Sequence, residues 1–239
     1  ILEWCKKKSY RFITLQECYA ILSGKIRQEG KVAYLSFDDG WQSNLNLIPI
    51  IDKYQAPITI FVSIDPLLSG NFWWEYALAD GIELRNKMKL MSYKKFVSSL
   101  ESLKKKYSLE RSVLTEQELV KIASHPLVSI QSHTMSHPIL TNCDDEILSY
   151  ELNSSKAYLE NLLHHKIEAF SYPNGNFSNR EIEAVKKAGY KMAFTTEYIP
   201  IQINHTNLYR IPRMAMNTYG GYYENLSKIL GIWQDILKK

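Results

Sequence analysis

Two adjacent carboxylates follow a short apolar stretch early in the chain. Residues 34–37 (Tyr-Leu-Ser-Phe) lead directly into Asp38, Asp39 and Gly40. Neighbouring residues on a strand point to opposite faces, so one carboxylate could hold a metal ion while the other faces a substrate. Gly40 lets the chain turn sharply at that point. Asp-Asp-Gly is also common turn chemistry, so these residues alone leave a plain turn open.

Two histidines four residues apart form the second chemical feature. His133 and His137 stand in the stretch 132–138. On one helical turn the two imidazoles would share a face and could reach one cation. Two histidines and one aspartate suit a divalent transition metal, with coordination positions left for water and substrate. The alternative is a pair of surface histidines in a loop.

Stretches 36–40 (Ser-Phe-Asp-Asp-Gly) and 132–138 (Ser-His-Thr-Met-Ser-His-Pro) together resemble the paired motifs of the polysaccharide deacetylase family. This family is also called the NodB-homology domain or carbohydrate esterase family 4, and the resemblance extends from about Thr14 to about Met216. It implies an α/β fold, namely a distorted, incomplete (β/α)7 TIM-like barrel. It also implies a metal-dependent hydrolase that removes acetyl groups from N-acetylated sugars of a cell-surface polysaccharide or its precursor.

The resemblance implies a role for each motif residue. Asp38 resembles the catalytic base, and Asp39, His133 and His137 resemble the three ligands of a divalent metal ion. Zinc is the first expectation for that ion, and cobalt or nickel would suit the same ligands.

The stretch 171–175 (Ser-Tyr-Pro-Asn-Gly) resembles the third motif of the family. The main-chain N–H of Asn174 would then donate to the oxyanion formed during hydrolysis, a role that tolerates a changed side chain. The alternative is a Pro-Asn-Gly turn without chemistry. Substrate contacts are expected from five residues, namely Tyr172, Pro173, Gly175, Arg213 and Trp73.

Ser171 departs from the family pattern, which usually has an arginine here that steadies the base. Tyr172 is similar to a subgroup that includes deacetylases of exported poly-N-acetylglucosamine, in which an arginine from a late strand can compensate. Arg210 and Arg213 are the candidates for that role, and Arg213 matches the subgroup better. Either arginine could instead be a structural ion-pair partner.

The general acid is the second departure. The family normally supplies it from a late Leu-x-His motif, and no such motif follows Met214. His205, which stands in a polar loop, is one candidate, and its alternative is a solvated loop residue. The proton could also come from water at the metal or from residues that precede Ile1 in a longer chain.

Composition indicates one globular domain over residues 1–239. The chain is 45% hydrophobic and 23% charged, and its net charge is +4, from 29 Lys and Arg against 25 Asp and Glu. The basic residues are dispersed, which argues against nucleic-acid binding. No apolar run is long enough to span a bilayer, and no secretory signal is visible. The three cysteines fit neither a disulfide framework nor a zinc knuckle.

The expected partner is an acetylated oligo- or polysaccharide. The family resemblance favours a periplasmic, secreted or other cell-envelope location, with a cytoplasmic location as the alternative. Two other functions stay open from the sequence. One is a catalytically weak relative that only binds glycans, and the other is a hydrolase of a non-sugar amide.

Alternating helix and strand patterns must position these residues. Capping boxes at 14–17 and 115–118 predict two helix starts. Apolar patterns predict strands over residues 32–37, 58–62, 127–130, 168–171 and 191–195, with a late apolar segment at 208–216. They predict helices over residues 14–27, 44–54, 92–107, 115–125, 144–163, 178–188 and 222–237. Such alternation indicates a parallel sheet with the site at the carboxyl ends of its strands.

Segment 63–90 shows no regular pattern and contains the aromatic run 72–76 (Phe-Trp-Trp-Glu-Tyr). Exposed, these rings would form a wall on which sugar rings stack; buried, they would anchor an insertion. Burial is favoured for most of them because large aromatic side chains are usually buried. Trp73 or Trp74 is the candidate for the cleft.

Overall fold

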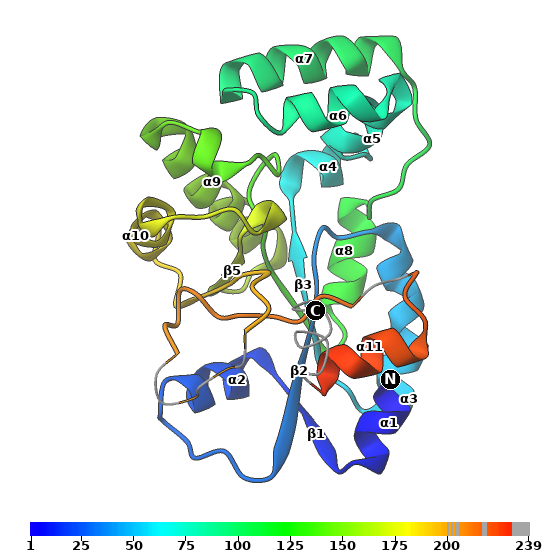
Figure 1. Cartoon of the computed structure of the whole chain (residues 1–239), viewed down its shortest axis with the longest axis vertical. Helices are drawn as coiled ribbons and strands as arrows, with labels where there is room; N and C mark the ends of the chain where they lie inside the picture. The colour runs from blue at the N-terminus through cyan, green and yellow to red at the C-terminus, as the bar shows by residue number, and fades with distance from the viewer. Residues whose placement is uncertain (200, 202, 204–205, 217–218, 231–239) are drawn as a thin grey trace, which may run out of the picture.

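The structure is a computed structural model that describes the chain except residues 200, 202, 204–205, 217–218 and 231–239. The described residues form one sheet of six strands, whose order in the sheet follows their order in the chain. The strands are β1 (Tyr10–Ile13), β2 (Lys31–Phe37), β3 (Ile58–Val62), β4 (Val128–Ser132), β5 (Ala169–Ser171) and β6 (Met192–Phe194). All neighbouring pairs are parallel. The sheet curls into a half-barrel with helices around it (Figure 1), which confirms the incomplete α/β barrel expected from the sequence.

The late apolar segment lies beside β6. Phe194 forms a parallel bridge with Ile211, and the main-chain N–H of Ile211 donates to the carbonyl of Ala193 at 2.9 Å. This pairing is one bridge rather than a full strand. It places the segment where a seventh barrel strand would stand, and it brings Arg213 to the same end of the sheet as Asp38.

Helices connect the strands as the capping boxes predict. Both capping boxes form, at Thr14 and at Thr115. The helices are α1 (Leu2–Lys7), α2 (Leu15–Leu22), α3 (Ile48–Tyr54), α4 (Ile64–Ser69), α5 (Trp73–Asp80), α6 (Ile82–Met88), α7 (Tyr93–Lys106), α8 (Glu116–Ala123), α9 (Asp145–Leu163), α10 (Asn179–Lys187) and α11 (Tyr222–Ile229), with short 3-10 helices η1 (Gln42–Leu47), η2 (Leu140–Asn142) and η3 (Pro173–Gly175). Of the described helices, none combines the length and the apolar character needed to cross a bilayer.

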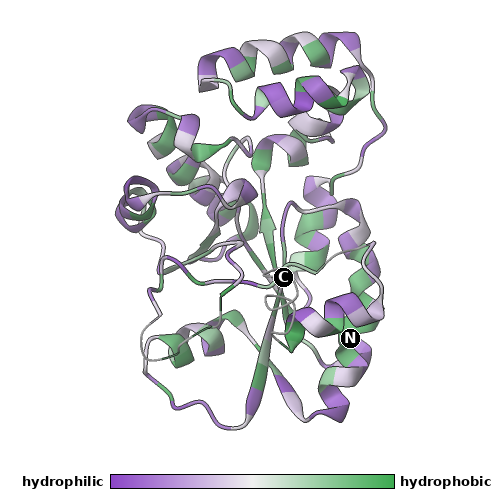
Figure 2. Cartoon of the chain, viewed as in Figure 1, coloured by the Kyte–Doolittle hydropathy of each residue, from purple (hydrophilic) through white to green (hydrophobic). Residues whose placement is uncertain are grey.

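The sheet is covered by apolar side chains on both faces. All five residues of β3 are buried. Its successive residues Ile60 and Phe61 belong to different hydrophobic clusters because they point to opposite faces of the sheet. Figure 2 shows β3 as largely hydrophobic and the surrounding helices as mixtures of hydrophobic and hydrophilic residues. A run of apolar residues without alternation is typical of such a doubly covered parallel strand.

Segment 63–90 is helical, which the sequence pattern did not predict. It forms α4, α5 and α6, and Figure 1 shows α5, α6 and α7 grouped at one end of the molecule. These helices have their own small hydrophobic cluster, which includes Trp73, Met88 and Phe96. Helices of six to eight residues are too short to show a clear apolar stripe, so periodicity could not identify them.

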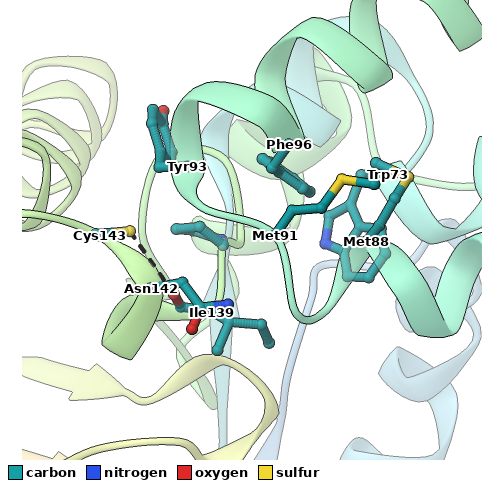
Figure 3. Close-up of a pocket in the computed structure, with 9 residues that line it drawn as sticks. Trp73, Met88, Met91, Tyr93, Phe96, Ile139, Asn142 and Cys143 are labelled. Carbon is teal, nitrogen blue, oxygen red and sulfur yellow. Dashed lines mark hydrogen bonds between the residues drawn. The ribbon is translucent and has the colours of Figure 1, made fainter.

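The helical insertion is attached to the loop that follows β4. Met88 and Phe96 of the insertion and Ile139 and Cys143 of the loop line a small, mostly apolar pocket of about 10 Å³ (Figure 3). The Asn142 side chain donates to the main-chain carbonyl of Lys89 at 2.8 Å. The end of α6 is therefore fixed relative to the loop that carries His133 and His137.

Candidate active site

The turn after β2 sends its two carboxylates in different directions. Asp39 has a φ of 81°, in the left-handed region, and Gly40 follows with a φ of 83°. A Cβ atom at residue 40 would lie 3.2 Å from Val62 Cγ1, so the close approach to β3 also favours glycine. Asp38 consequently faces Arg213, while Asp39 faces the two histidines.

The histidine motif is a loop, so the expectation of a helical turn is wrong. β4 ends at Ser132, and the chain from His133 to His137 is irregular. Positive φ angles at Thr134 (73°) and His137 (55°) fold the loop back on itself. The two imidazole rings therefore still meet, with their centroids 4.7 Å apart.

A buried carboxylate holds this loop. Glu151 of α9 accepts hydrogen bonds from the main-chain N–H groups of Met135 (2.8 Å) and Ser136 (2.9 Å). It also accepts from the hydroxyls of Ser136 (2.6 Å) and Tyr93 (3.2 Å). Burial raises the pKa of Glu151, and the bonds from Ser136 oppose that shift. Glu151 has no exposed surface, so these hydrogen bonds replace the water that an exposed carboxylate would bind.

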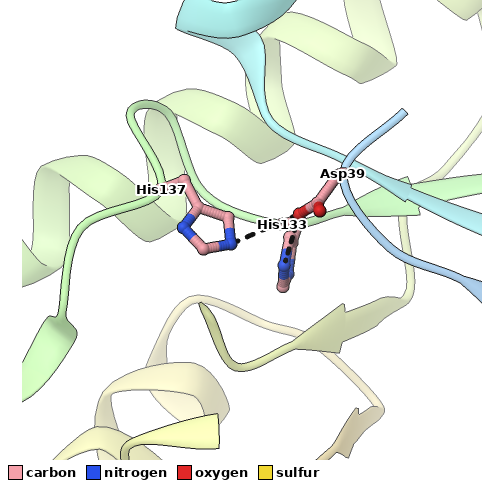
Figure 4. Close-up of side chains that lie close together, drawn as sticks. All are labelled: Asp39, His133 and His137. Carbon is pink, nitrogen blue, oxygen red and sulfur yellow. Dashed lines mark ion pairs between the residues drawn. The ribbon is translucent and has the colours of Figure 1, made fainter. Parts of the chain in front are cut away.

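Asp39, His133 and His137 converge on one point (Figure 4). Asp39 Oδ1 lies 3.6 Å from His133 Nε2 and 3.3 Å from His137 Nε2, and one ligand atom from each residue lies within 4.8 Å of the others. This donor set suits a divalent transition metal. The group combines the ends of β2 and β4, the two strands that flank β3 in the sheet.

Outer hydrogen bonds orient His133 and Asp39. His133 Nδ1 lies 2.7 Å from the carbonyl of Ser171, which leaves Nε2 directed at Asp39. The Trp41 indole N–H donates to Asp39 Oδ2 at 3.0 Å, and His137 Nδ1 is buried without a partner in the part of the chain that the structure describes. Burial lowers the pKa of His133 to about 4, so this imidazole is neutral near pH 7, as metal binding requires. The residues fit a cation, since metal-binding imidazoles commonly have such outer partners.

Arg213 forms a two-pronged ion pair with Asp38. Arg213 Nη1 donates to Asp38 Oδ1 at 2.8 Å and Nη2 donates to Oδ2 at 2.7 Å. The guanidinium also donates to the hydroxyls of Ser171 (2.7 Å) and Ser36 (3.0 Å). Burial alone would raise the pKa of Asp38, but Arg213 and then His133 lower it to about 2. Arg210 instead pairs with Glu197 at the surface, Nε to Oε2 at 2.8 Å.

Within the third motif, Asn174 is the residue that lines the cavity beside this group. Tyr172 has no exposed surface, and its hydroxyl donates to the Tyr209 carbonyl at 3.0 Å. Pro173 is buried, and a Cβ at Gly175 would lie 1.9 Å from Thr196 Oγ1. In contrast to the sequence expectation, Tyr172, Pro173 and Gly175 shape the turn and do not line the cavity.

The cavity has a volume of about 330 Å³ and is lined by Asp38 and by the three candidate metal ligands, whereas Arg213 does not line it. Its lining consists of Asp38, Asp39, Trp73, Trp74, Arg85, Lys89, His133, His137, Asn174 and Thr196. Trp73 is 4% exposed and donates through its indole N–H to the His137 carbonyl at 3.0 Å, so its surface in the cavity is small. Trp74 is more exposed, stacks on Phe72 and lies 4.7 Å from His137 between ring centroids.

Sequence reasoning missed several residues that contact or line this site, Thr196 of the cavity lining among them. Arg85 and Lys89 lie in the segment that showed no pattern, and their spacing of four residues was the one available signal. Trp41 and Glu151 carried no motif signal, because their contacts depend on the fold. His205, the candidate general acid, lies outside the described residues.

A protein-family model matches most of the chain, and the match agrees with the parallel strands and the carboxylate–histidine cluster at their carboxyl ends. The polysaccharide deacetylase family model matches residues 25–193, and the chain belongs to this family. The family is therefore the one that the two sequence motifs indicated.

Individual relatives cover most of the chain. YxkH of Bacillus subtilis (strain 168) is 24% identical over 233 residues, covering 94% of this chain and 68% of the relative. The poly-beta-1,6-N-acetyl-D-glucosamine N-deacetylase of Staphylococcus aureus (strain MSSA476) is 25% identical over 218 residues, covering 90% of this chain and 64% of the relative. The chain therefore spans roughly two thirds of the length of these proteins.

A solved structure supports the same fold. IcaB from Ammonifex degensii superposes with a TM-score of 0.66 at 17% sequence identity, covering 97% of this chain and 85% of that one. This likeness supports the fold, and the family match places the chain among the polysaccharide deacetylases.

Proposed function

We propose that this protein is a metal-dependent deacetylase that hydrolyses N-acetyl groups on sugars of a cell-surface polysaccharide or its precursor. One observation carries the proposal. The cavity holds both an ionised carboxylate, Asp38, and a separate cation-binding group, Asp39 with His133 and His137. A protein that only binds glycans has no need of a base beside a metal ligand set.

Asp38 is the group that accepts a proton from the attacking water. A divalent cation at Asp39, His133 and His137 would polarise the acetyl carbonyl and make nearby water more acidic. Because the pKa of Asp38 is about 2, this carboxylate is ionised across the neutral range but is a weak base. It therefore works only on a water whose own pKa has been lowered.

Asn174 is the proposed oxyanion donor. Its φ of 55° is in the left-handed region, inside the tight turn of η3 that begins directly after Tyr172. Main-chain N–H groups at such turns stabilise charge that develops on a carbonyl oxygen. Ser171 links this turn to the base, since its hydroxyl contacts both Asp38 (3.2 Å) and Arg213.

The substrate class is supported by the relatives. The Staphylococcus aureus relative is named for N-deacetylation of poly-beta-1,6-N-acetyl-D-glucosamine, so an N-acetylglucosamine polymer is the first substrate to test. Trp74 offers the more exposed of the two indole rings in the cavity, and an aromatic face of this kind suits stacking against a sugar ring.

Acetate release from a panel of glycans tests this proposal. N-acetylglucosamine oligomers and O-acetylated xylan would be compared in the presence of zinc, cobalt or nickel. We expect zinc-supported release from the oligomers and little from the ester substrate. Preferential release from xylan would replace the amide assignment with an ester one, and glycan binding without release under any metal would contradict the enzyme assignment.

A further inference from the structure

Two cationic side chains line the cavity on the side opposite the barrel. Arg85 lies in α6, and Lys89, four positions later, directly follows the last residue of this helix. Residues four apart on a helix share one face, and both side chains line the same 330 Å³ cavity as Asp38 and His137. Both are half-buried, so they are neither free surface cations nor core residues.

Neither cation is neutralised within the described part of the chain. Arg85 donates from Nε (3.3 Å) and Nη2 (2.9 Å) to the amide oxygen of Asn86, and Lys89 Nζ donates to Asn174 Oδ1 at 3.1 Å. Both acceptors are neutral amides. The acidic groups of the cavity already have partners, because Asp38 pairs with Arg213 and Asp39 contacts the two histidines.

Hydrogen bonds hold both the main chain and the side chain of Lys89 in position. Its main-chain carbonyl accepts from Asn142, and its ammonium group reaches Asn174, 85 residues away in sequence. A lysine at the end of a helix commonly interacts with that helix's own last carbonyls. Here the side chain instead contacts the turn that carries the proposed oxyanion donor.

We propose that Arg85 and Lys89 form an anion subsite, which binds a phosphate or carboxylate group that the glycan carries next to its acetylated sugar. This inference rests on the proposed function, because it specifies the substrate of the same cavity. Guanidinium and ammonium groups are the side chains that bind phosphate and carboxylate oxygens. The substrate class is then an acidic N-acetylated glycan rather than a neutral one.

Calorimetric binding of three small probes tests the subsite. N-acetylglucosamine is the neutral probe, N-acetylglucosamine 6-phosphate carries a phosphate, and N-acetylmuramic acid carries a carboxylate. Zinc-loaded wild-type protein should bind a charged probe at least about tenfold more tightly than the neutral one, as one charge-assisted contact allows. The preferred charged probe identifies whether the glycan supplies phosphate or carboxylate.

Three variants separate the subsite from general charge effects. Arg85→Gln and Lys89→Gln should each weaken binding of the charged probe about tenfold and leave the neutral probe unchanged. Lys87→Gln is the matched control, because Lys87 is an exposed cation of the same helix that does not line the cavity. An equal loss in Lys87→Gln would overturn the proposal, as would equal binding of all three probes by the wild-type protein.

Acetate release from matched acidic and neutral N-acetylated oligosaccharides distinguishes failure of this inference from failure of the proposed function. Equal release from both, unaffected by Arg85→Gln and Lys89→Gln, would overturn the anion subsite and leave the deacetylase intact. Charge-selective probe binding with no acetate release from any glycan would support the subsite and overturn the deacetylase. An effect of the two variants confined to inhibition by acetate would also overturn the proposal, since it would assign the cations to the product.

Discussion

At the scale of single residues, two aspartates that are neighbours in sequence have different partners in the site. The left-handed conformation of Asp39 turns its carboxylate toward the histidines, while Asp38 meets Arg213. His137 and Asn174 also have positive φ. Such conformations are costly for residues other than glycine, and they gather where a site requires a particular geometry.

Exchange of Asp38 for asparagine tests the division of labour between the two carboxylates. Asp38→Asn should reduce turnover at least about 100-fold because it removes the proposed base, while bound zinc stays at the wild-type level. Asp39→Asn should lose zinc and activity together. Elemental analysis beside an acetate-release assay measures both, and loss of zinc from Asp38→Asn would mean that the two roles are exchanged.

Removal of the Arg213 guanidinium should move the pH dependence of the reaction. Arg213 lowers the pKa of Asp38 against the effect of burial, so Arg213→Gln should raise that pKa. The proposed base accepts a proton only when ionised, and the acid limb of the pH–rate profile should therefore shift to higher pH. Turnover would be measured between pH 4.5 and 8 at saturating zinc.

Arg210→Gln is the control for this shift, because Arg210 pairs with Glu197 at the surface. Its profile should coincide with that of the wild-type protein. Superimposable profiles for Arg213→Gln and wild type would show that Arg213 does not set the protonation of Asp38.

At the scale of elements, the site depends on helix α9 as much as on the strands. Glu151 accepts two main-chain N–H groups from the loop between His133 and His137. Because a strand end alone does not fix the loop that follows it, this carboxylate positions both imidazoles. The insertion of α5 and α6 adds the other wall of the cavity.

Replacement of Glu151 should therefore affect the cation site although Glu151 does not belong to it. Glu151→Leu should weaken zinc binding about tenfold or more, as loss of an outer hydrogen-bonding partner does elsewhere. Glu151→Gln should retain most of the affinity, because an amide oxygen can accept the two N–H groups and its NH2 can donate to the hydroxyls of Ser136 and Tyr93. Competition with a chromogenic chelator measures the affinity, and wild-type zinc binding by Glu151→Leu would rule out this positioning role.

The sequence predicted the elements that carry a local signal, such as a capping box or a run of β-branched residues. It did not predict short elements without periodicity or contacts between distant parts of the chain. Capping boxes identified α2 and α8, and β-branched apolar residues identified β3. The four-residue strand β1 and the short helices of the insertion had no periodicity to read. The histidine spacing suggested a helix because sequence distance cannot distinguish a helical turn from a loop with two positive φ angles.

The candidate site was predictable to the extent that it lies in compact motifs. Asp38, Asp39, His133 and His137 converge because each follows the carboxyl end of a strand near the centre of the sheet. The family resemblance already favoured Arg213 over Arg210, but the contact of Arg213 with Asp38 and the contact of Lys89 with Asn174 needed the structure. Those assignments depend on contacts across 175 and 85 residues of chain.

At the scale of the whole molecule, the buried site couples folding to protonation. Burial lowers the pKa of His133 from 6.5 to about 4, so the metal-free folded state binds fewer protons than the unfolded state between these values. Its free energy of unfolding should therefore fall as the pH decreases from about 6.5 to about 4, by at most about 3 kcal/mol. Above pH 6.5 this contribution is complete.

Urea unfolding of the metal-depleted protein at pH 7, 5.5 and 4.5 measures this dependence. His133→Asn should show a smaller decrease over the same range, because it removes the group that titrates. An equal decrease in the variant would assign the pH dependence to other residues.

Acetate release by metal-depleted protein, measured during stepwise addition of zinc, tests whether the reaction depends on the candidate cation site. Asp39, His133 and His137 form one candidate cation site in the described chain. We predict negligible release without metal and a rise in proportion to bound zinc that reaches its maximum at one equivalent per chain. Full release of acetate by the metal-free protein would contradict the proposed mechanism.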